Sequence, residues 1–369
     1  MTLMKREIIM KTDVIPVKDK KVVLGLSGGV DSTTACLLLQ QKGYEVTGLY
    51  FNVLSEKCIN SRENIRKGRE KAERAAKELG IQFIYKDMSQ EFEKTVIRNF
   101  CDEYICGRTP NPCIMCNPNV KFKVLSETAD EIGAEYIATG HYAGTFYDEA
   151  TGNWHIRKAA NEAKDQSYML YRLPQNIISR LILPLNDVAD KEEVREKART
   201  MKLSNADASD SQEICFIDKE DNYEDFIRRM GITSRPGRFV NREGEVLGEH
   251  KGVIHYTIGQ RKGLGIALGK PAFVTEIDGD NNRIILGDNE ELFKKEVISS
   301  DNVFACDFKD GIRVTAKIRY AARPAEAMLK NNCDGTVSCI FVDPQRAPTP
   351  GQSIVFYVND ILIGGGFIK

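Results

Sequence analysis

The chain has 369 residues, of which 42% are hydrophobic and 28% are charged, and its formal net charge is −1. This length predicts two or three domains, and the near-zero charge excludes a global basic field, so that any nucleic-acid contact must come from local patches. No apolar run reaches the roughly 18 residues of a membrane span, and the first 21 residues lack the core of a signal peptide. Ten cysteines are sparse for this length, which favours a reducing compartment over a disulfide scaffold. We therefore expect a cytoplasmic protein without a membrane partner, and we interpret residues 1–19 as an N-terminal extension.

The first half of the sequence alternates apolar strands with helical segments. Strands are expected at 21–26, 45–54, 82–88 and 135–140, and helices at 31–42, 60–79, 90–104 and 121–132. Between the last two of these helices, a segment rich in proline and asparagine predicts an ordered, irregular loop. The alternation predicts an α/β fold built on a doubly wound parallel sheet.

The pattern changes near residue 217. One short helix is expected at 222–230, and short strands separated by Gly, Pro and Asn follow it. The strings "REGE" and "DGDNN" are typical of hairpin turns. We predict a doubly wound domain over 20–216, a central linking domain over 217–282 and a C-terminal β-barrel over 283–369.

A glycine-rich string, Ser27-Gly28-Gly29-Val30-Asp31-Ser32, stands between the first strand and the first helix. It lacks the lysine of a Walker loop and the spacing of the dinucleotide fingerprint. Its two glycines allow backbone N–H groups to face an anion, and the helix N-terminus adds a positive partial charge. Asp31 can cap the helix or hold Mg²⁺ beside phosphates. A merely capped helix start is the alternative, and the complete string favours a phosphate site.

The cysteines provide the second chemical signal. Cys113 and Cys116 form a C-x-x-C pair, and Cys215 follows far along the chain in "SDSQEICFI". Incidental packing is one interpretation, because free cysteine is often buried. Structural zinc is another, although only one such pair exists and zinc usually takes four ligands. The third is sulfur chemistry, in which spaced thiolates carry and exchange persulfide sulfur.

Six strings occur in one order: "SGGVDS", "GRTPNPCIMCNPNVKF", "ATGHYA", "KDQSYML", "DSQEICFI" and "IGQRKGLGI". The first resembles the pyrophosphate loop of enzymes that cleave ATP between its α and β phosphates. Together the six resemble the tRNA-specific 2-thiouridylase family, over about residues 20–369. The resemblance implies an adenine nucleotide alpha-hydrolase-like fold for the ATP-pyrophosphatase domain.

The resemblance also implies roles for individual residues. Cys116 matches the family nucleophile, and Cys215 matches the cysteine that carries the persulfide. The matches to ATP contacts are Gly25, Leu26, Ser27, Gly28, Gly29, Val30, Asp31, Ser32, Phe51 and Gly140. The matches to tRNA contacts are Asn111, Pro112 and Cys113 at the target base, with His141, Lys164, Asp165, Gln166, Arg319, Tyr320 and Gln352 elsewhere.

One position departs from the family pattern. Many members carry Asp where Cys113 stands, so the acid/base or ligand duties of that carboxylate are in doubt here. The change leaves Cys113, Cys116 and Cys215 as three thiolates that could hold a [4Fe-4S] cluster with one open iron. We keep this cluster route beside the persulfide route, in which Cys116 and Cys215 end as a disulfide.

The reaction implied is ATP-dependent 2-thiolation of the wobble uridine in tRNA. ATP with Mg²⁺ would adenylate the uridine O2, and sulfur from a relay protein or a cysteine desulfurase would replace it. Basic residues that could grip RNA phosphates are Arg228, Arg229, Arg235, Arg238, Arg242, Arg261 and Lys262, although each can equally be a solvated surface charge. The alternatives are an ATP-dependent amidating synthetase of the same fold and a non-catalytic zinc RNA-binding module.

Overall fold

The computed structural model describes residues 20–188, 214–218 and 220–369. Its first part contains a five-stranded sheet in the order β3-β2-β1-β4-β7, and every neighbouring pair in it is parallel. The five strands are β1 (Lys21–Gly25), β2 (Glu45–Asn52), β3 (Gln82–Asp87), β4 (Tyr136–Ala138) and β7 (Leu181–Ile182). Strands β2 and β4 flank β1 on opposite sides, so the strand order reverses beside β1. Ligands of such sheets bind at this reversal, outside the carboxyl ends of the strands.

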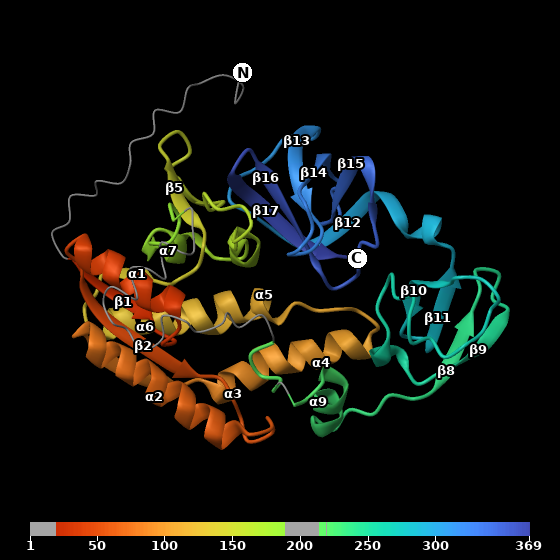
Figure 1. The fold of residues 1–369 in the computed structure, drawn as a ribbon. Helices are drawn as coiled ribbons and strands as arrows, with labels where there is room; N and C mark the ends of the chain where they lie inside the picture. Colours follow the sequence, from red (N-terminus) through yellow and green to blue (C-terminus); the bar gives the residue numbers. More distant parts are fainter. Residues whose placement is uncertain (1–19, 189–213, 219) are drawn as a thin grey trace.

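Helices cover both faces of this sheet, which confirms the doubly wound prediction (Figure 1). On one face, α1 (Val30–Gln41) and α2 (Ser61–Leu79) pack with Leu24 of β1 in one apolar cluster. On the other face, α6 (Phe122–Glu131) packs with Val23 of β1 in a second cluster. Alternate residues of β1 therefore face opposite layers, as a strand with two buried faces requires.

The segment between β3 and β4 is almost entirely helical. Its elements are α3 (Ser89–Phe92), the π-helical turn η1 (Glu93–Ile97), α4 (Arg98–Ile105), α5 (Pro112–Cys116), the π-helical turn η2 (Asn117–Lys121) and α6. The prediction of an irregular loop was therefore wrong from residue 112 onward. Pro112 occupies the first turn of α5, where its missing N–H costs no hydrogen bond. Pro118 lies in the wider turn η2, which accommodates a residue that an α-helix interior would exclude.

A smaller four-stranded sheet follows, in the order β10-β11-β8-β9. Its elements are α9 (Tyr223–Arg229), β8 (Gly237–Val240), β9 (Val246–His250), the 3-10 turn η4 (Val253–His255), β10 (Phe273–Asp278) and β11 (Arg283–Gly287). The chain reverses at 241–245 and at 279–282, so both predicted hairpin turns are confirmed. Phe239 of β8 shares an apolar cluster with Phe100 of α4 and Phe226 of α9, which joins this sheet to the first part.

The C-terminal strands form a closed six-stranded barrel, because β12 pairs with both β15 and β17. Its elements are η5 (Asn289–Leu292), β12 (Phe293–Phe304), β13 (Ile312–Lys317), β14 (Ala325–Asn331), β15 (Val337–Arg346), β16 (Ser353–Val358) and β17 (Ile361–Ile368). This confirms that a C-terminal barrel is present, although β11, which lies within the predicted range 283–369, pairs in the smaller sheet instead. A hairpin of the first part, β5 (Gly144–Asp148) and β6 (Asn153–Arg157), extends the same sheet through a pair between Arg157 and Ile361.

The residues that join α4 to α5 lie between the two C-terminal units. The backbone N–H of Thr109 donates to the carbonyl of Pro350 at 2.9 Å, and the Gln352 amide donates to the carbonyl of Thr109 at 2.7 Å. On the other side, a Cβ at Gly279 would lie 2.6 Å from the carbonyl oxygen of Cys106. The helix that carries Cys113 and Cys116 therefore starts from a segment that both C-terminal units support.

The remaining short elements are η3 (Ser167–Leu170) and α7 (Gln175–Ile178). Among the described helices, none is long and apolar enough to cross a membrane. The expected extension at 1–19 lies outside the described residues.

Candidate functional site

The glycine string forms the turn between β1 and α1, at the reversal of strand order. Gly28 has φ +71°, and a Cβ there would lie 2.8 Å from the backbone carbonyl oxygen of Lys71, so only glycine fits this turn. The hydroxyls of Ser27 and Ser32 lie 3.2 Å apart, and the N–H of Gly29 donates to the Ser27 hydroxyl at 3.3 Å. The loop thus presents hydroxyls and N–H groups at a helix N-terminus, as the predicted phosphate site requires.

The end of β4 packs directly on this turn. A Cβ at Gly140 would lie 2.9 Å from the backbone carbon of Asp31 and the backbone nitrogen of Ser32. The Tyr142 hydroxyl donates to the Asp31 carboxylate at 2.9 Å, and the side-chain oxygen of Gln166 accepts from the Tyr142 N–H at 3.0 Å. Gln166, from the string "KDQSYML", therefore helps to hold the end of β4 against the turn that follows β1.

The C-x-x-C pair lies on α5. The side-chain oxygen of Asn111 accepts from the N–H of Cys113 at 3.1 Å and caps the helix. Cys113 is exposed and Cys116 is partly buried. Because residues three apart share a helix face, both thiols face the same side, which an irregular loop would not ensure.

Cys215 faces this pair from a distant part of the chain. Its side chain is exposed, yet the surrounding protein atoms raise the pKa of its thiol to about 12, and Cys116 and Cys113 raise it further by repulsion. Burial likewise raises the pKa of Cys116, while the charge and the backbone N–H of Lys121 lower it. Lys121 also lowers the pKa of Cys215. Three thiols and one ammonium group thus form an electrostatically coupled set.

His141 lies between the thiols and the glycine loop. The Lys121 ammonium lies 3.4 Å from its Nε2, and the Thr139 hydroxyl lies 2.7 Å from its Nδ1. Burial and the charge of Lys121 both hold the pKa of His141 well below its usual range, so the imidazole is neutral at pH 7. Because His141 follows Gly140 directly, the thiols and the glycine loop border one continuous region.

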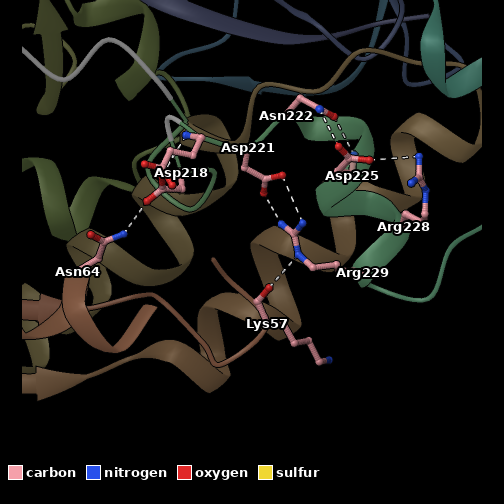
Figure 2. A network of polar contacts seen from close by, with 9 residues as sticks. Lys57, Asn64, Asp218, Asp221, Asn222, Asp225, Arg228 and Arg229 are labelled. Atoms are coloured by element: carbon pink, nitrogen blue, oxygen red, sulfur yellow. Dashed lines mark hydrogen bonds and ion pairs between the residues drawn. The ribbon is translucent and has the colours of Figure 1, made fainter. Parts of the chain in front are cut away.

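Three contacts fix the chain just after Cys215. Phe216 is buried among aromatic rings, with centroids 5.5 Å from Phe92 and 5.1 Å from Phe226. Figure 2 shows the next two: the Asn64 amide donates to Asp218 at 2.8 Å, and Arg229 pairs with Asp221 through both of its terminal nitrogens. Arg229 also donates to the carbonyl of Lys57 at 3.4 Å. The position of Cys215 is therefore set by anchors on α2, α3 and α9.

Comparisons with known proteins identify the family. Models described as tRNA methyl transferase HUP domain, tRNA methyl transferase PRC-barrel domain and aminomethyltransferase beta-barrel domain match residues 20–219, 224–288 and 294–368. A tRNA-specific 2-thiouridylase of Clostridioides difficile is 43% identical over 357 residues, covering 95% of this chain and 98% of that protein. One of Syntrophomonas wolfei is 45% identical over 350 residues, covering 94% and 99%.

The chain belongs to the tRNA-specific 2-thiouridylase family. The resemblance read from the six strings is thereby confirmed. A solved structure of a 4-thiouridine synthetase bound to RNA and ATP is 18% identical, with a TM-score of 0.33, over 57% of this chain and 50% of that one.

Within the described residues, the thiols of this family member are neither paired with one another nor grouped as metal ligands. All ten cysteines are free, so the pairing of Cys116 with Cys215 is not present in this state. In the part of the chain that the structure describes, no three His, Cys, Asp or Glu side chains are grouped to hold a metal ion. Cys113, Cys116 and Cys215 therefore do not form a ready-made ligand set for a [4Fe-4S] cluster, and the same holds for zinc.

Two pairs of the family's expected tRNA contacts have different surroundings in the structure. Asp165 is buried, and its carboxylate accepts from the N–H of Ala159 and from the N–H and hydroxyl of Ser167. Asp165 and Gln166 thus stabilise the protein itself, and their contact with tRNA stays a prediction. Arg319 and Tyr320 are exposed on the barrel. Burial raises the pKa of the Tyr320 hydroxyl, Asp165 and Cys113 raise it further, and Lys164 lowers it. Tyr320 therefore lies near Cys113 of α5.

Three of the arginines proposed as phosphate grips are paired within the protein. Arg228 pairs with Asp225 at 3.1 Å, Arg242 pairs with Glu291 at 3.3 Å, and Arg229 pairs with Asp221. Only the pair of Arg228 with Asp225, three positions apart in the helix predicted at 222–230, could be inferred from sequence spacing. Reasoning from the sequence also missed Lys121. The one feature that pointed to it was its basic side chain, five positions after Cys116.

Proposed function

We propose that this protein catalyses the ATP-dependent 2-thiolation of the wobble uridine in tRNA anticodons. The observation that carries the proposal is the coupled set of Cys113, Cys116, Cys215 and Lys121 beside the glycine loop. A phosphate crevice next to redox-capable thiols fits a reaction that activates an oxygen with ATP and replaces it with sulfur. The relatives' names, tRNA-specific 2-thiouridylase, support the same substrate and product.

In the first step, the uridine O2 attacks the α-phosphate of ATP, and pyrophosphate leaves onto the glycine loop. The N–H groups and hydroxyls from Ser27 to Ser32 would hold its charge. Asp31 stands at the N-terminus of α1 and offers the carboxylate that Mg²⁺ prefers beside phosphates. Phe51, which is half-buried between two apolar clusters, would contact the nucleotide.

In the second step, the terminal sulfur of a Cys215 persulfide attacks C2 of the adenylated uridine, and AMP leaves. The Cys116 thiolate then attacks Sγ of Cys215, which forms a disulfide and releases the thiocarbonyl. An external thiol must reduce this disulfide, and a sulfur-relay protein or cysteine desulfurase must reload Cys215. Lys121 would favour the thiolate forms, because its charge lowers the pKa of both cysteines.

The test is thiolation of a wobble-uridine tRNA by Cys116→Ser and Cys215→Ser, with ATP binding measured in parallel. Each variant should lose thiolation and keep ATP binding. Cys333→Ser is the matched control, because Cys333 is exposed on the barrel. Retained thiolation in either active-site variant would refute the assignment.

A metal assay separates the two sulfur routes. Protein purified without oxygen should contain no iron or acid-labile sulfide if the persulfide route holds. About four iron atoms per chain would instead favour a [4Fe-4S] cluster, and would require the three thiols to rearrange. Cys113→Ser then discriminates further: it should stay active on the persulfide route and be inactive on the cluster route.

A further inference from the structure

A buried lysine that forms no ion pair with any described residue lies at the end of β13. Lys317 is only 8% exposed, and its ammonium nitrogen lies 5.9 Å from the ring centroid of Tyr168 and 5.6 Å from that of Tyr320. Among the described residues, no carboxylate lies within 4 Å of it and none accepts a hydrogen bond from it. The faces of aromatic rings offset only part of the cost of removing an ammonium group from water. The Lys317 ammonium group therefore lacks an anion that would offset the rest.

A second lysine approaches the same place from the first part of the chain. The ammonium group of Lys158, next to β6, lies 4.6 Å from the ring centroid of Tyr357 and 3.4 Å from the carbonyl oxygen of Asn359. Burial and repulsion by Lys158 lower the pKa of Lys317, whereas Asp165 raises it. The carboxylate of Asp165 is already engaged by Ala159 and Ser167. Two ammonium groups and one carboxylate therefore leave an excess positive charge in this lysine–tyrosine cluster (Lys158, Tyr168, Lys317, Tyr320 and Tyr357).

The cluster lies next to the reacting thiols. Tyr320 contacts Lys317 on one side, and its hydroxyl is coupled electrostatically to Cys113 of α5 on the other. Tyr320 is 37% exposed, so one of the rings around Lys317 is open to a large ligand. Aromatic faces beside cations are typical of sites that bind single-stranded RNA.

We propose that Lys317 and Lys158 form a subsite for a backbone phosphate of the substrate RNA, close to the nucleotide that Cys113 meets. This proposal depends on the proposed function, because RNA is the anion that it names. The phosphate supplies the partner that Lys317 lacks, and Tyr168 and Tyr320 hold the ammonium group in place before RNA arrives. A phosphate bound here would fix the RNA strand relative to α5, since Tyr320 bridges the two.

The test is tRNA binding by fluorescence anisotropy over a series of salt concentrations. Lys317→Met should weaken binding about tenfold, as expected when one charged hydrogen bond is lost. It should also lower the slope of log affinity against log salt by about 0.7, the value for one phosphate contact on a single strand. Lys317→Arg should keep the wild-type slope. Lys330→Met is the matched control, because Lys330 is exposed on β14 and should leave the slope unchanged.

The outcomes separate this inference from the proposed function. Wild-type protein that fails to bind tRNA would overturn both. Wild-type binding together with an unchanged slope in Lys317→Met would overturn the subsite alone. If Lys317→Met does not melt cooperatively, Lys158→Met decides: a lower slope supports the subsite, and an unchanged slope overturns it.

Discussion

The ion pair between Arg229 and Asp221 should determine how firmly the Cys215 segment is held. The Asp221 side chain is 2% exposed and that of Arg229 is 33% exposed, so the pair lies between a surface and a buried ion pair. Breaking a fully buried pair costs about 3–5 kcal/mol, and breaking a surface pair costs up to about 1 kcal/mol. We expect Arg229→Gln to cost about 2–3 kcal/mol, because it leaves the buried carboxylate without its cation.

The control is on the same helix. Arg228 pairs with Asp225 three residues away, and its side chain is 68% exposed, so Arg228→Gln should cost no more than about 0.5 kcal/mol. Asp221→Asn should cost less than Arg229→Gln, because the freed guanidinium can reach water. The measurement is the free energy of unfolding from urea titrations, with thiolation rates measured below the transition.

The same variants test the alternative role of Arg229 as a phosphate grip. If Arg229 anchors Cys215, Arg229→Gln lowers stability and thiolation but leaves the salt dependence of tRNA binding unchanged. Equal urea midpoints for Arg229→Gln and Arg228→Gln, together with a lower salt slope for Arg229→Gln, would refute the reasoning.

Two further predictions concern the crevice. Gly140→Ala places a methyl group 2.9 Å from the backbone of α1, so ATP binding should weaken in a nucleotide titration. An ATP affinity equal to that of the wild type would contradict the prediction. His141 has a depressed pKa in the folded state, so below pH 6.5 the unfolded chain binds the extra proton and stability falls. His141→Gln should therefore lose less stability than the wild type between pH 7.5 and pH 5.5 in urea titrations, and parallel losses would contradict this.

The sequence predicted the parts of the fold that depend on local pattern. Strand–helix alternation gave the parallel sheet, and the glycine string was placed correctly at the end of β1. The prediction failed at residues 112–121, where the proline content suggested a loop. A proline is harmless in the first turn of a helix and is tolerated in a π turn, so these residues are helical.

The candidate site was less accessible to such reasoning. The approach of Cys215 to Cys116 depends on tertiary contacts such as those of Phe216 and Asp221, which no local pattern encodes. The resemblance to a family supplied that pairing instead. Lys121 was missed because its importance comes from His141 and Cys215, which reach it only in the folded chain.

The support that Pro350 and Gln352 give to Thr109 has a consequence for synthesis of the chain. The helix with Cys113 and Cys116 is translated early, but the residues that hold its leading segment emerge from the ribosome more than two hundred positions later. Domains fold as they emerge, so the parallel sheet can form while this segment still lacks its final hydrogen bonds. The nascent protein should thus acquire its nucleotide site before its thiols are fixed in place, and an incomplete chain would bind ATP without being able to pass on sulfur.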